Sequence, residues 1–190
     1  DAKTFPSFLE NHSEPLRPAK ATVYSLISSH GRDSDYLAFA RANGDLDRIV
    51  LHFIQHEQHM KAVEALSRSL RENANAEPSL RTTLFYQHAA ELLRACPAET
   101  VQVWLEAPFL DPCRLIPAMV DFTKSNQENE PPSEDVIRYL ENCVNVQGNR
   151  DEAVHNLLLS LYARLPTDDA LRDFLQNPDA CYDPKFALRT

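Results

Sequence analysis

The sequence predicts an all-α protein, arranged as an α-solenoid of stacked antiparallel helical hairpins. Apolar residues recur with the period of an α-helix from one end of the chain to the other. Glycine is scarce, with three residues in 190, whereas strand-rich folds need it for their turns. The corners between periodic segments are short and polar, which favours antiparallel neighbours. We therefore expect about ten helices in a single solenoid segment over residues 1–190.

The first helices are predicted over residues 20–30, 35–43, 45–55 and 60–70. The third has the clearest apolar stripe, with the spacing i, i+3, i+4, i+7, i+8 at Leu46, Ile49, Val50, Phe53 and Ile54. Gly31 and Gly44 follow the first two segments, where glycine can adopt the left-handed conformation that ends a helix.

Prolines mark the helix boundaries in the middle of the chain. A long helix is predicted over residues 80–96, and Pro97 then stands near the first turn of a helix over 97–107, where its missing N–H costs nothing. The next helix, over 111–124, contains Pro117, which predicts a kink or a late helix start.

An acidic loop with two prolines is predicted over residues 125–135, and Ser133 is placed to cap the helix that follows. The acidic side chains of this stretch are Glu128, Glu130, Glu134 and Asp135. We expect them to be solvated, and the alternative is a regulatory or docking role. The remaining helices are predicted over 135–146, 151–165, 168–177 and 183–190.

Two helix pairs share a plan in which a polar corner precedes an Ala-Val pair at the start of a buried stripe. One is QHMKAVEAL, with Ala62-Val63, and the other is GNRDEAVHNLLL, with Ala153-Val154. The similarity is imperfect, but in an all-helical chain it favours a solenoid in which each hairpin contacts mainly its neighbours.

Composition argues against several kinds of partner. The net charge of −9 makes nucleic acid and anionic membrane surfaces unlikely partners, because both require clustered Lys and Arg. No apolar run reaches the roughly 18 residues that a membrane-spanning helix needs. The chain opens on DAKTF without an initiating Met, so we expect it to be a piece of a longer protein.

The histidine-rich stretch LHFIQHEQHM raises the question of a metal site at His52, His56 and His59. On a helical wheel His52 and His56 flank the apolar stripe, whereas Glu57 falls within it, so the helix is predicted to end near His56. His59 then belongs to the next helix, on its inward face. The three imidazoles are split across a corner, and the H-E-x-x-H spacing is absent. We expect surface His52 and His56, a packed His59, and no stoichiometric zinc.

No other residues form a convincing reaction centre. Cys96, Cys113, Cys143 and Cys181 are widely spaced, which indicates reduced thiols in the core. Cys143 and His155 could pair as nucleophile and base, but a structural cysteine is favoured. Trp104 is expected to be a core anchor. Gly31, Gly44 and Gly148 lie too far apart to cradle a phosphate. We expect no catalytic residue, no cofactor and no small-molecule substrate.

Six stretches together resemble the middle region of the "deep orange" class C vacuolar protein-sorting subunit, shared by the HOPS and CORVET tethering complexes. They occur in order as TVYSLISSHG, DLDRIVLHFIQHEQHMKAVEAL, LFYQHAAELLRACPAETVQVWLE, LDPCRLIPAMVDF, VIRYLENCVNVQGNRDEAVHNLLLSLYA and YDPKFALR. The likeness is densest from Leu110 to Ala163. Two departures concern local packing: His59 stands where the family tends to have an aromatic residue, and the loop at 125–135 looks longer than usual.

The resemblance implies a long protein with an amino-terminal β-propeller, an α-solenoid similar to clathrin heavy-chain repeats, and a carboxy-terminal RING-type zinc finger. This segment would be solenoid only, so any ubiquitin-ligase activity would lie outside it. Its expected role is a scaffold and docking segment that binds other tethering-complex subunits. The expected location is cytoplasmic, peripheral on the late endosome and the vacuole or lysosome.

Two other classes of function remain as alternatives. A clathrin-like coat scaffold would self-assemble into cages. An enzyme domain would show a deep pocket lined by titratable groups with shifted pKa values.

Overall fold

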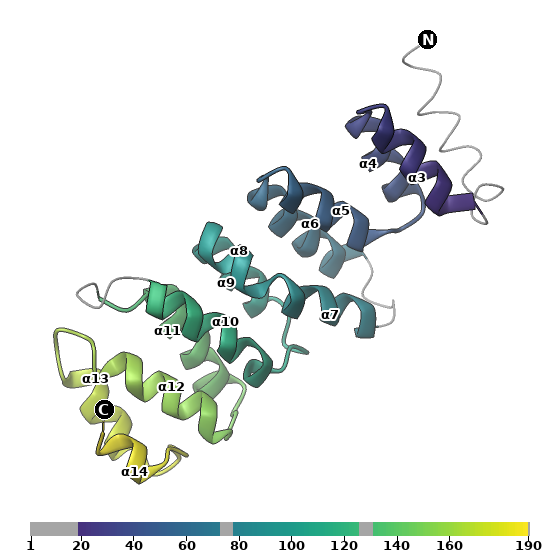
Figure 1. Ribbon diagram of the computed structural model, residues 1–190. Coiled ribbons are helices and arrows are strands. Elements are labelled where there is room, and N and C mark those ends of the chain that lie inside the picture. Colours follow the sequence, from purple (N-terminus) through teal and green to yellow (C-terminus); the bar gives the residue numbers. More distant parts are fainter. Residues whose placement is uncertain (1–18, 73–77, 126–130, 190) are drawn as a thin grey trace. The chain divides into compact units, whose positions relative to one another are not determined.

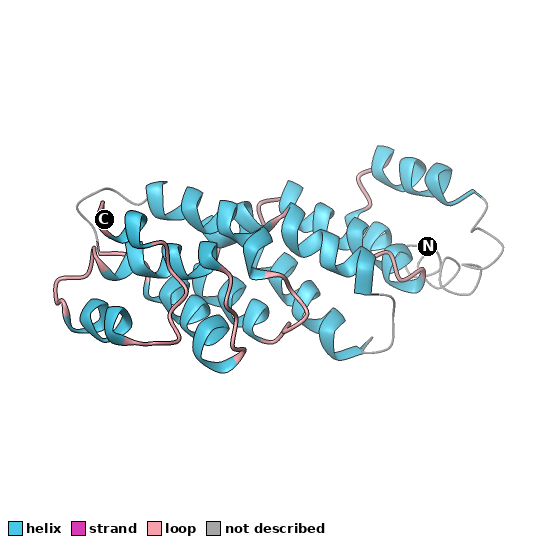
Figure 2. Ribbon diagram, turned by 90° about the horizontal axis from the view of Figure 1, so that it is seen from below, coloured by secondary structure: helices cyan, strands magenta, loops and turns pink. Residues whose placement is uncertain are grey.

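The computed structural model describes residues 19–72, 78–125 and 131–189 of the chain. Within these ranges it contains twelve α-helices and one π-helix, and no strand (Figure 2). The predicted all-α class is confirmed. None of the helices in these ranges has the length and hydrophobicity needed to cross a bilayer.

The chain divides into two compact units, residues 1–72 and 73–190 (Figure 1). In unit 1 the described helices are α3 (Lys20–Ser29), α4 (Asp33–Ala42), α5 (Leu46–Gln55) and α6 (His59–Glu72). Each packs against the next along the chain. Because corners of only three residues join them, successive helices run in opposite directions, as the sequence predicted.

Left-handed residues form the corners of unit 1. Gly31 and Gly44 have φ angles of 62° and 69°, which confirms their predicted place at helix ends. The corner between α5 and α6 has no glycine, and there Glu57 takes a φ of 56°. A side chain in this conformation costs roughly 1–2 kcal/mol, so the surrounding helix packing must hold it there.

One hydrophobic cluster of unit 1 lies where α3 meets α4. Its buried members are Tyr24, Ile27, Phe39 and Ala40. The stripe predicted on α5 is also turned inward, with Val50, Phe53 and Ile54 buried and Ile49 packed against the cluster.

Unit 2 holds the other helices. They are α7 (Pro78–Gln87), α8 (Ala89–Ala95), α9 (Pro97–Leu105), α10 (Pro112–Ser125), α11 (Glu134–Glu141), the π-helix η2 (Asn142–Val146), α12 (Glu152–Tyr162), α13 (Asp169–Gln176) and α14 (Pro184–Ala187). α8 packs against α9 and α10, α11 packs against α9 and α12, and α12 also packs against α10, α13 and α14. The layers therefore follow the chain order, as expected for stacked hairpins.

The core of unit 2 is large and apolar. Trp104 of α9 is 2% exposed and meets the ring of Tyr139 of α11 edge-on, with ring centroids 5.4 Å apart. The predicted role of Trp104 as a core anchor is confirmed. Other large, fully buried side chains of this unit include Phe85, Leu92, Leu93, Leu115, Met119, Leu140 and Leu158.

The expected number of about ten helices is too low for the described residues, which contain twelve α-helices. The helix predicted over 80–96 is broken at His88, whose ψ of 6° separates α7 from α8. The apolar pattern continues through this break, so periodicity does not reveal it. The helix predicted over 135–146 ends as an α-helix at Glu141 and continues as η2, where the Gln147 N–H donates to the Asn142 carbonyl at 3.0 Å.

Two predictions about proline segments have different outcomes. α10 begins at Pro112 and runs through Pro117, so of the two predicted outcomes the late helix start is excluded and the kink at Pro117 stays a prediction. Of the loop predicted over 125–135, residues 126–130 lie outside the described residues, Ser125 ends α10 and Glu134 begins α11. Ser133 occupies the predicted N-cap position with extended backbone angles, but its hydroxyl accepts no capping hydrogen bond.

Candidate functional site

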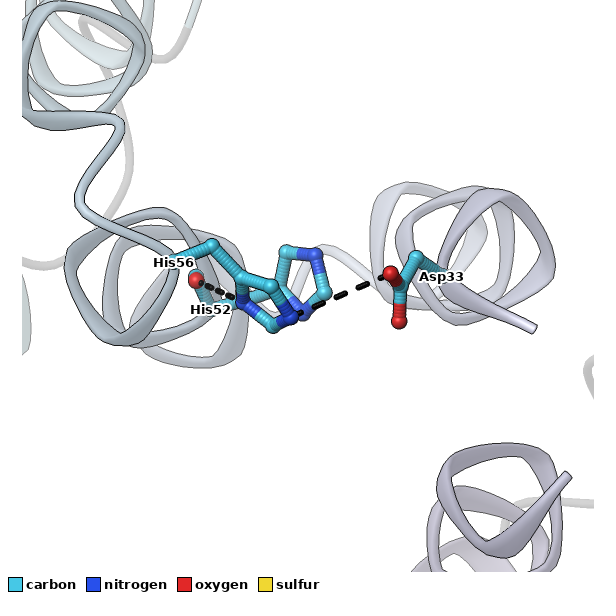
Figure 3. A group of neighbouring side chains, drawn as sticks. All are labelled: Asp33, His52 and His56. Atoms are coloured by element: carbon cyan, nitrogen blue, oxygen red, sulfur yellow. Dashed lines mark hydrogen bonds and ion pairs between the residues drawn. The ribbon is translucent and has the colours of Figure 1, made fainter. Parts of the chain in front are cut away.

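A cluster of two imidazoles and one carboxylate lies in unit 1, where α4 begins and α5 ends. Asp33 is the first residue of α4, His52 lies in the last turn of α5, and His56 is the residue that caps it. Figure 3 shows the two imidazoles side by side, with the His56 ring directed toward Asp33. The His52 and His56 ring centroids are 4.2 Å apart, as the i, i+4 spacing on a helix allows.

The local sequence explains why α5 ends beside this cluster. The backbone leaves the helix at His56, whose ψ is 17°, and turns through left-handed Glu57. His59 then opens α6 and is half-buried. The predicted end of the helix near His56 and the assignment of His59 to the next helix are both confirmed. His59 is not a member of the cluster, whose third residue is Asp33.

The prediction that His52 lies on the surface is wrong. Its side chain is only 9% exposed and stacks on the ring of Tyr36, with centroids 5.1 Å apart and an angle of 22° between the planes. The helical wheel placed His52 beside the apolar stripe of α5, but α4 packs on that flank as well. A wheel drawn for one helix does not show which neighbour covers its edges.

His56 is exposed as predicted and has a defined tautomer. Its Nδ1 lies 2.8 Å from the carbonyl oxygen of His52, and because a carbonyl can only accept, Nδ1 carries the hydrogen. The other nitrogen, Nε2, points toward Asp33 and lies 3.8 Å from its Oδ2 (Figure 3). In the neutral imidazole Nε2 therefore presents its lone pair to the carboxylate side of the cluster.

The electrostatics of the cluster favour an uncharged His52. Burial lowers the pKa of His52, and the neighbouring His56 lowers it further, while Asp33 acts in the opposite direction. Asp33 and His56 remain open to solvent, with side-chain exposures of 60% and 43%. The cluster thus has one buried side and one open side.

The donor set of this cluster matches a transition-metal site. One ligand atom from each of Asp33, His52 and His56 can be chosen so that all three lie within 4.8 Å of one another. Imidazole nitrogens with a carboxylate oxygen suit zinc and its neighbours better than magnesium or calcium, which prefer oxygen ligands alone. Sequence reasoning missed Asp33 because it lies 19 residues before His52 and on a different helix.

The cysteine and histidine weighed as a nucleophile pair have separate partners. His155 is 1% exposed; its Nδ1 accepts from the Cys181 N–H at 3.1 Å and its Nε2 donates to the Asn149 carbonyl at 2.9 Å. Burial raises the pKa of Cys143 to about 11, so this thiol is protonated at neutral pH. Both features favour structural roles for Cys143 and His155.

The four cysteines are free thiols, of which Cys96 and Cys143 are buried and Cys113 and Cys181 half-buried. Burial, together with the neighbouring Asp151, raises the pKa of Cys113 to about 12. The expectation of core thiols therefore holds for the two buried residues only.

The described surface also carries large, exposed apolar side chains. Those in unit 1 are Leu26, Leu51 and Met60, and those in unit 2 are Phe109, Val146, Leu175, Phe186 and Leu188. Val146 is the most exposed of those that lie inside a helix, at 75%. Such residues are candidates for contact with other proteins, although single exposed apolar residues are common on any protein surface.

Comparison with known proteins gives consistent relatives. The family described as "VPS18, alpha-solenoid domain, second half" matches residues 46–190. "Vacuolar sorting protein 18" of Arabidopsis thaliana is 36% identical over 195 residues, which cover 97% of this chain and 18% of that protein. "Vacuolar protein sorting-associated protein 18 homolog" of Danio rerio is 32% identical, with the same coverage of each. "Vacuolar membrane protein pep3" of Schizosaccharomyces pombe is 28% identical over 85% of this chain and 16% of its own length. The chain therefore spans less than a fifth of the length of these relatives.

Proposed function

The chain belongs to the VPS18 α-solenoid family, and on this basis we propose that it is a scaffold and docking segment of a multisubunit membrane-tethering complex. The complex would act in vesicle traffic from endosomes to the vacuole or lysosome. The observation that carries the proposal is the match of residues 46–190 to the second half of the VPS18 solenoid domain. It bears out the class C vacuolar protein-sorting resemblance that the sequence motifs suggested.

The physical properties of the chain suit such a role. Helical hairpins that bury their apolar faces against the next hairpin give an extended support, because each added hairpin covers the face of the one before it. A tether needs such a support to present several docking surfaces at once. The net charge of −9 favours partner surfaces that are neutral or basic.

The segment would act through binding alone, with the rest of the tethering complex as its partner. The family is one of sorting proteins. The most reactive groups weighed from the sequence, Cys143 and His155, are buried and engaged in structural contacts. The names of the relatives from Arabidopsis and fission yeast point to the vacuole as the place of action, and we propose peripheral attachment on the cytoplasmic face of its membrane or of the late endosome.

The proposal is tested by co-purifying the 190-residue chain with each other subunit of the tethering complex in turn. We expect at least one subunit to bind in a stable hetero-complex. If none binds and the protein instead sediments as large self-assembled particles, the proposal fails and the clathrin-like coat is supported.

Exposed apolar residues make the test more specific. Replacing Val146 by Glu places a charge on a helix surface without disturbing the core, so a loss of binding would report contact at that site. The matched control is Gln147→Glu, which adds the same charge next to it without removing an apolar side chain. The same design applies to unit 1, where Met60 is 53% exposed and can be replaced by Glu.

A further inference from the structure

We propose that Asp33, His52 and His56 form a zinc-binding site that joins the start of α4 to the end of α5. This inference replaces the sequence-based expectation of no metal, which weighed His52 and His56 only together with His59. The third ligand comes instead from the preceding helix, a contact that the spacing along the chain could not indicate.

The types of ligand, and the spacing between the two histidines, are those found in zinc sites. Two histidines four residues apart present their rings on one side of a helix, and a carboxylate from another helix completes a set of three protein ligands. Three protein ligands leave a fourth position for water, and the open side formed by Asp33 and His56 gives water access to it.

The hydrogen bond made by the other nitrogen of the His56 ring supports this role. Metal-binding histidines usually donate their other ring N–H to a carbonyl or carboxylate, which fixes the ring and its tautomer. The Nδ1–H of His56 donates to the His52 carbonyl at 2.8 Å, so Nε2 is the atom left to bind the metal. On the buried side, stacking against Tyr36 fixes the ring of His52.

The three ligand atoms need to move only a short distance to reach the geometry of a zinc site. In a tetrahedral zinc site with bonds of about 2.0–2.2 Å, neighbouring ligand atoms lie roughly 3.4 Å apart. His56 Nε2 and Asp33 Oδ2 are already 3.8 Å apart, and the whole set lies within 4.8 Å. The distance between any two ligand atoms therefore needs to shorten by roughly 1.4 Å at most. This is within reach of the two exposed side chains, Asp33 and His56, whose rotamers are the freest of the three.

The simpler alternative is an ion pair between a protonated His56 and Asp33. It needs no metal, and it involves His52 only as a neighbour. The two interpretations differ in whether the chain takes up zinc and in whether His52 becomes a ligand.

Titration of the 190-residue chain with zinc chloride by calorimetry, after removal of bound metal with a chelator, separates them. We expect one zinc ion per chain, an affinity in the micromolar range or tighter, and no comparable uptake of magnesium or calcium. X-ray absorption of the zinc-loaded chain should show imidazole nitrogen and oxygen neighbours at about 2.0–2.2 Å and no sulfur. Sulfur among the atoms bound to zinc would place the metal on a cysteine and overturn the proposal.

Variants locate the site. His56→Gln and Asp33→Asn change exposed side chains and should each weaken zinc binding at least tenfold, with unchanged helix content by circular dichroism. The matched control is His59→Gln, three residues beyond His56 and outside the cluster, which should bind as the parent chain does. Absence of stoichiometric zinc in the parent chain, or equal losses in His59→Gln and His56→Gln, would overturn the proposal.

Discussion

Units 1 and 2 are built from the same kind of helical hairpin, but polar groups make up a larger share of the buried side chains in unit 1 than in unit 2. Unit 1 encloses polar groups between its helices: Asp35 is 2% exposed and forms an ion pair with Arg32, and the Tyr24 hydroxyl donates to Asp45 at 2.6 Å. Unit 2 is filled mainly by large apolar side chains around Trp104. The same backbone plan therefore accommodates different proportions of directional polar contacts and apolar packing. Substitutions should affect the two units in different ways.

The largest effect is expected from Trp104→Ala in the apolar interior of unit 2. Removing the indole leaves a cavity beside Tyr139, so the free energy of unfolding should fall by about 3–5 kcal/mol. Urea denaturation measures this loss, and hydrogen exchange in α9 and α11 locates it. The control Trp104→Phe, which keeps an aromatic ring in the cavity, should lose less. If Trp104→Ala lost under 1 kcal/mol, the volume-based account of unit 2 would be wrong.

His155→Ala examines a polar contact in the interior of unit 2. The His155 ring accepts a hydrogen bond from the Cys181 N–H and donates one to the Asn149 carbonyl, so its removal leaves these two backbone groups without partners. We expect a loss of about 1–3 kcal/mol, together with faster hydrogen exchange at the Cys181 amide. A larger loss than that of Trp104→Ala would break the comparison, because unit 2 would then depend on a directional contact as unit 1 does.

Tyr24→Phe removes one hydrogen bond in unit 1 and keeps the aromatic ring. In this variant Asp45 retains its contact with Lys20. We therefore expect the free energy of unfolding to fall by about 1.5 kcal/mol, which is the lower end of the range for hydrogen bonds to a charged group. A double-mutant cycle with Asp45→Asn isolates the interaction between the two side chains. Additive losses in that cycle would show that the Tyr24–Asp45 contact does not stabilise unit 1.

The smallest effect concerns the pH dependence contributed by His88 in unit 2. Burial lowers the pKa of His88 below its ordinary value of 6.5, although Glu91 partly opposes this. As the pH falls through about 6.5, the unfolded chain takes up a proton that folded His88 resists, so stability decreases. Above that pH the contribution is constant.

His88→Gln should flatten this part of the stability curve between pH 7.5 and 5, measured by hydrogen exchange in α8. The His59→Gln variant, in unit 1, is the control and should leave the exchange in α8 unchanged. An unaltered pH profile in His88→Gln would show that another group is responsible.

Much of the fold follows from local sequence, because a helix buries a stripe of residues that are three or four apart. The stripe on α5 and the left-handed glycines at 31 and 44 are examples. The break at His88 could not be predicted from the same pattern, because apolar spacing continues across it. Ser133 shows a further limit: its position was predictable, but the direction of its hydroxyl depends on neighbouring groups.

The candidate site was only half predictable. The pairing of His52 with His56 follows from their spacing of four residues, and the exclusion of His59 follows from the end of α5 at Gln55, before left-handed Glu57. Burial of His52 under Tyr36 and the approach of Asp33 are contacts between helices. Such contacts depend on how α4 packs on α5, which single-helix patterns do not contain.

The π-helix η2 forms the last turn of the helix that begins as α11, and left-handed Gly148 follows it in the corner before α12. A π turn closes with an i→i+5 hydrogen bond, so it holds one more residue than an α turn. Within η2 Cys143 is buried, while Val146, three residues on, is 75% exposed. The extra residue is equivalent to a single-residue insertion that the fold tolerates. Residues 142–146 are thus a place where a single deletion could be absorbed by reverting to α-helix, whereas a deletion within α12 would turn its remaining buried leucines toward water.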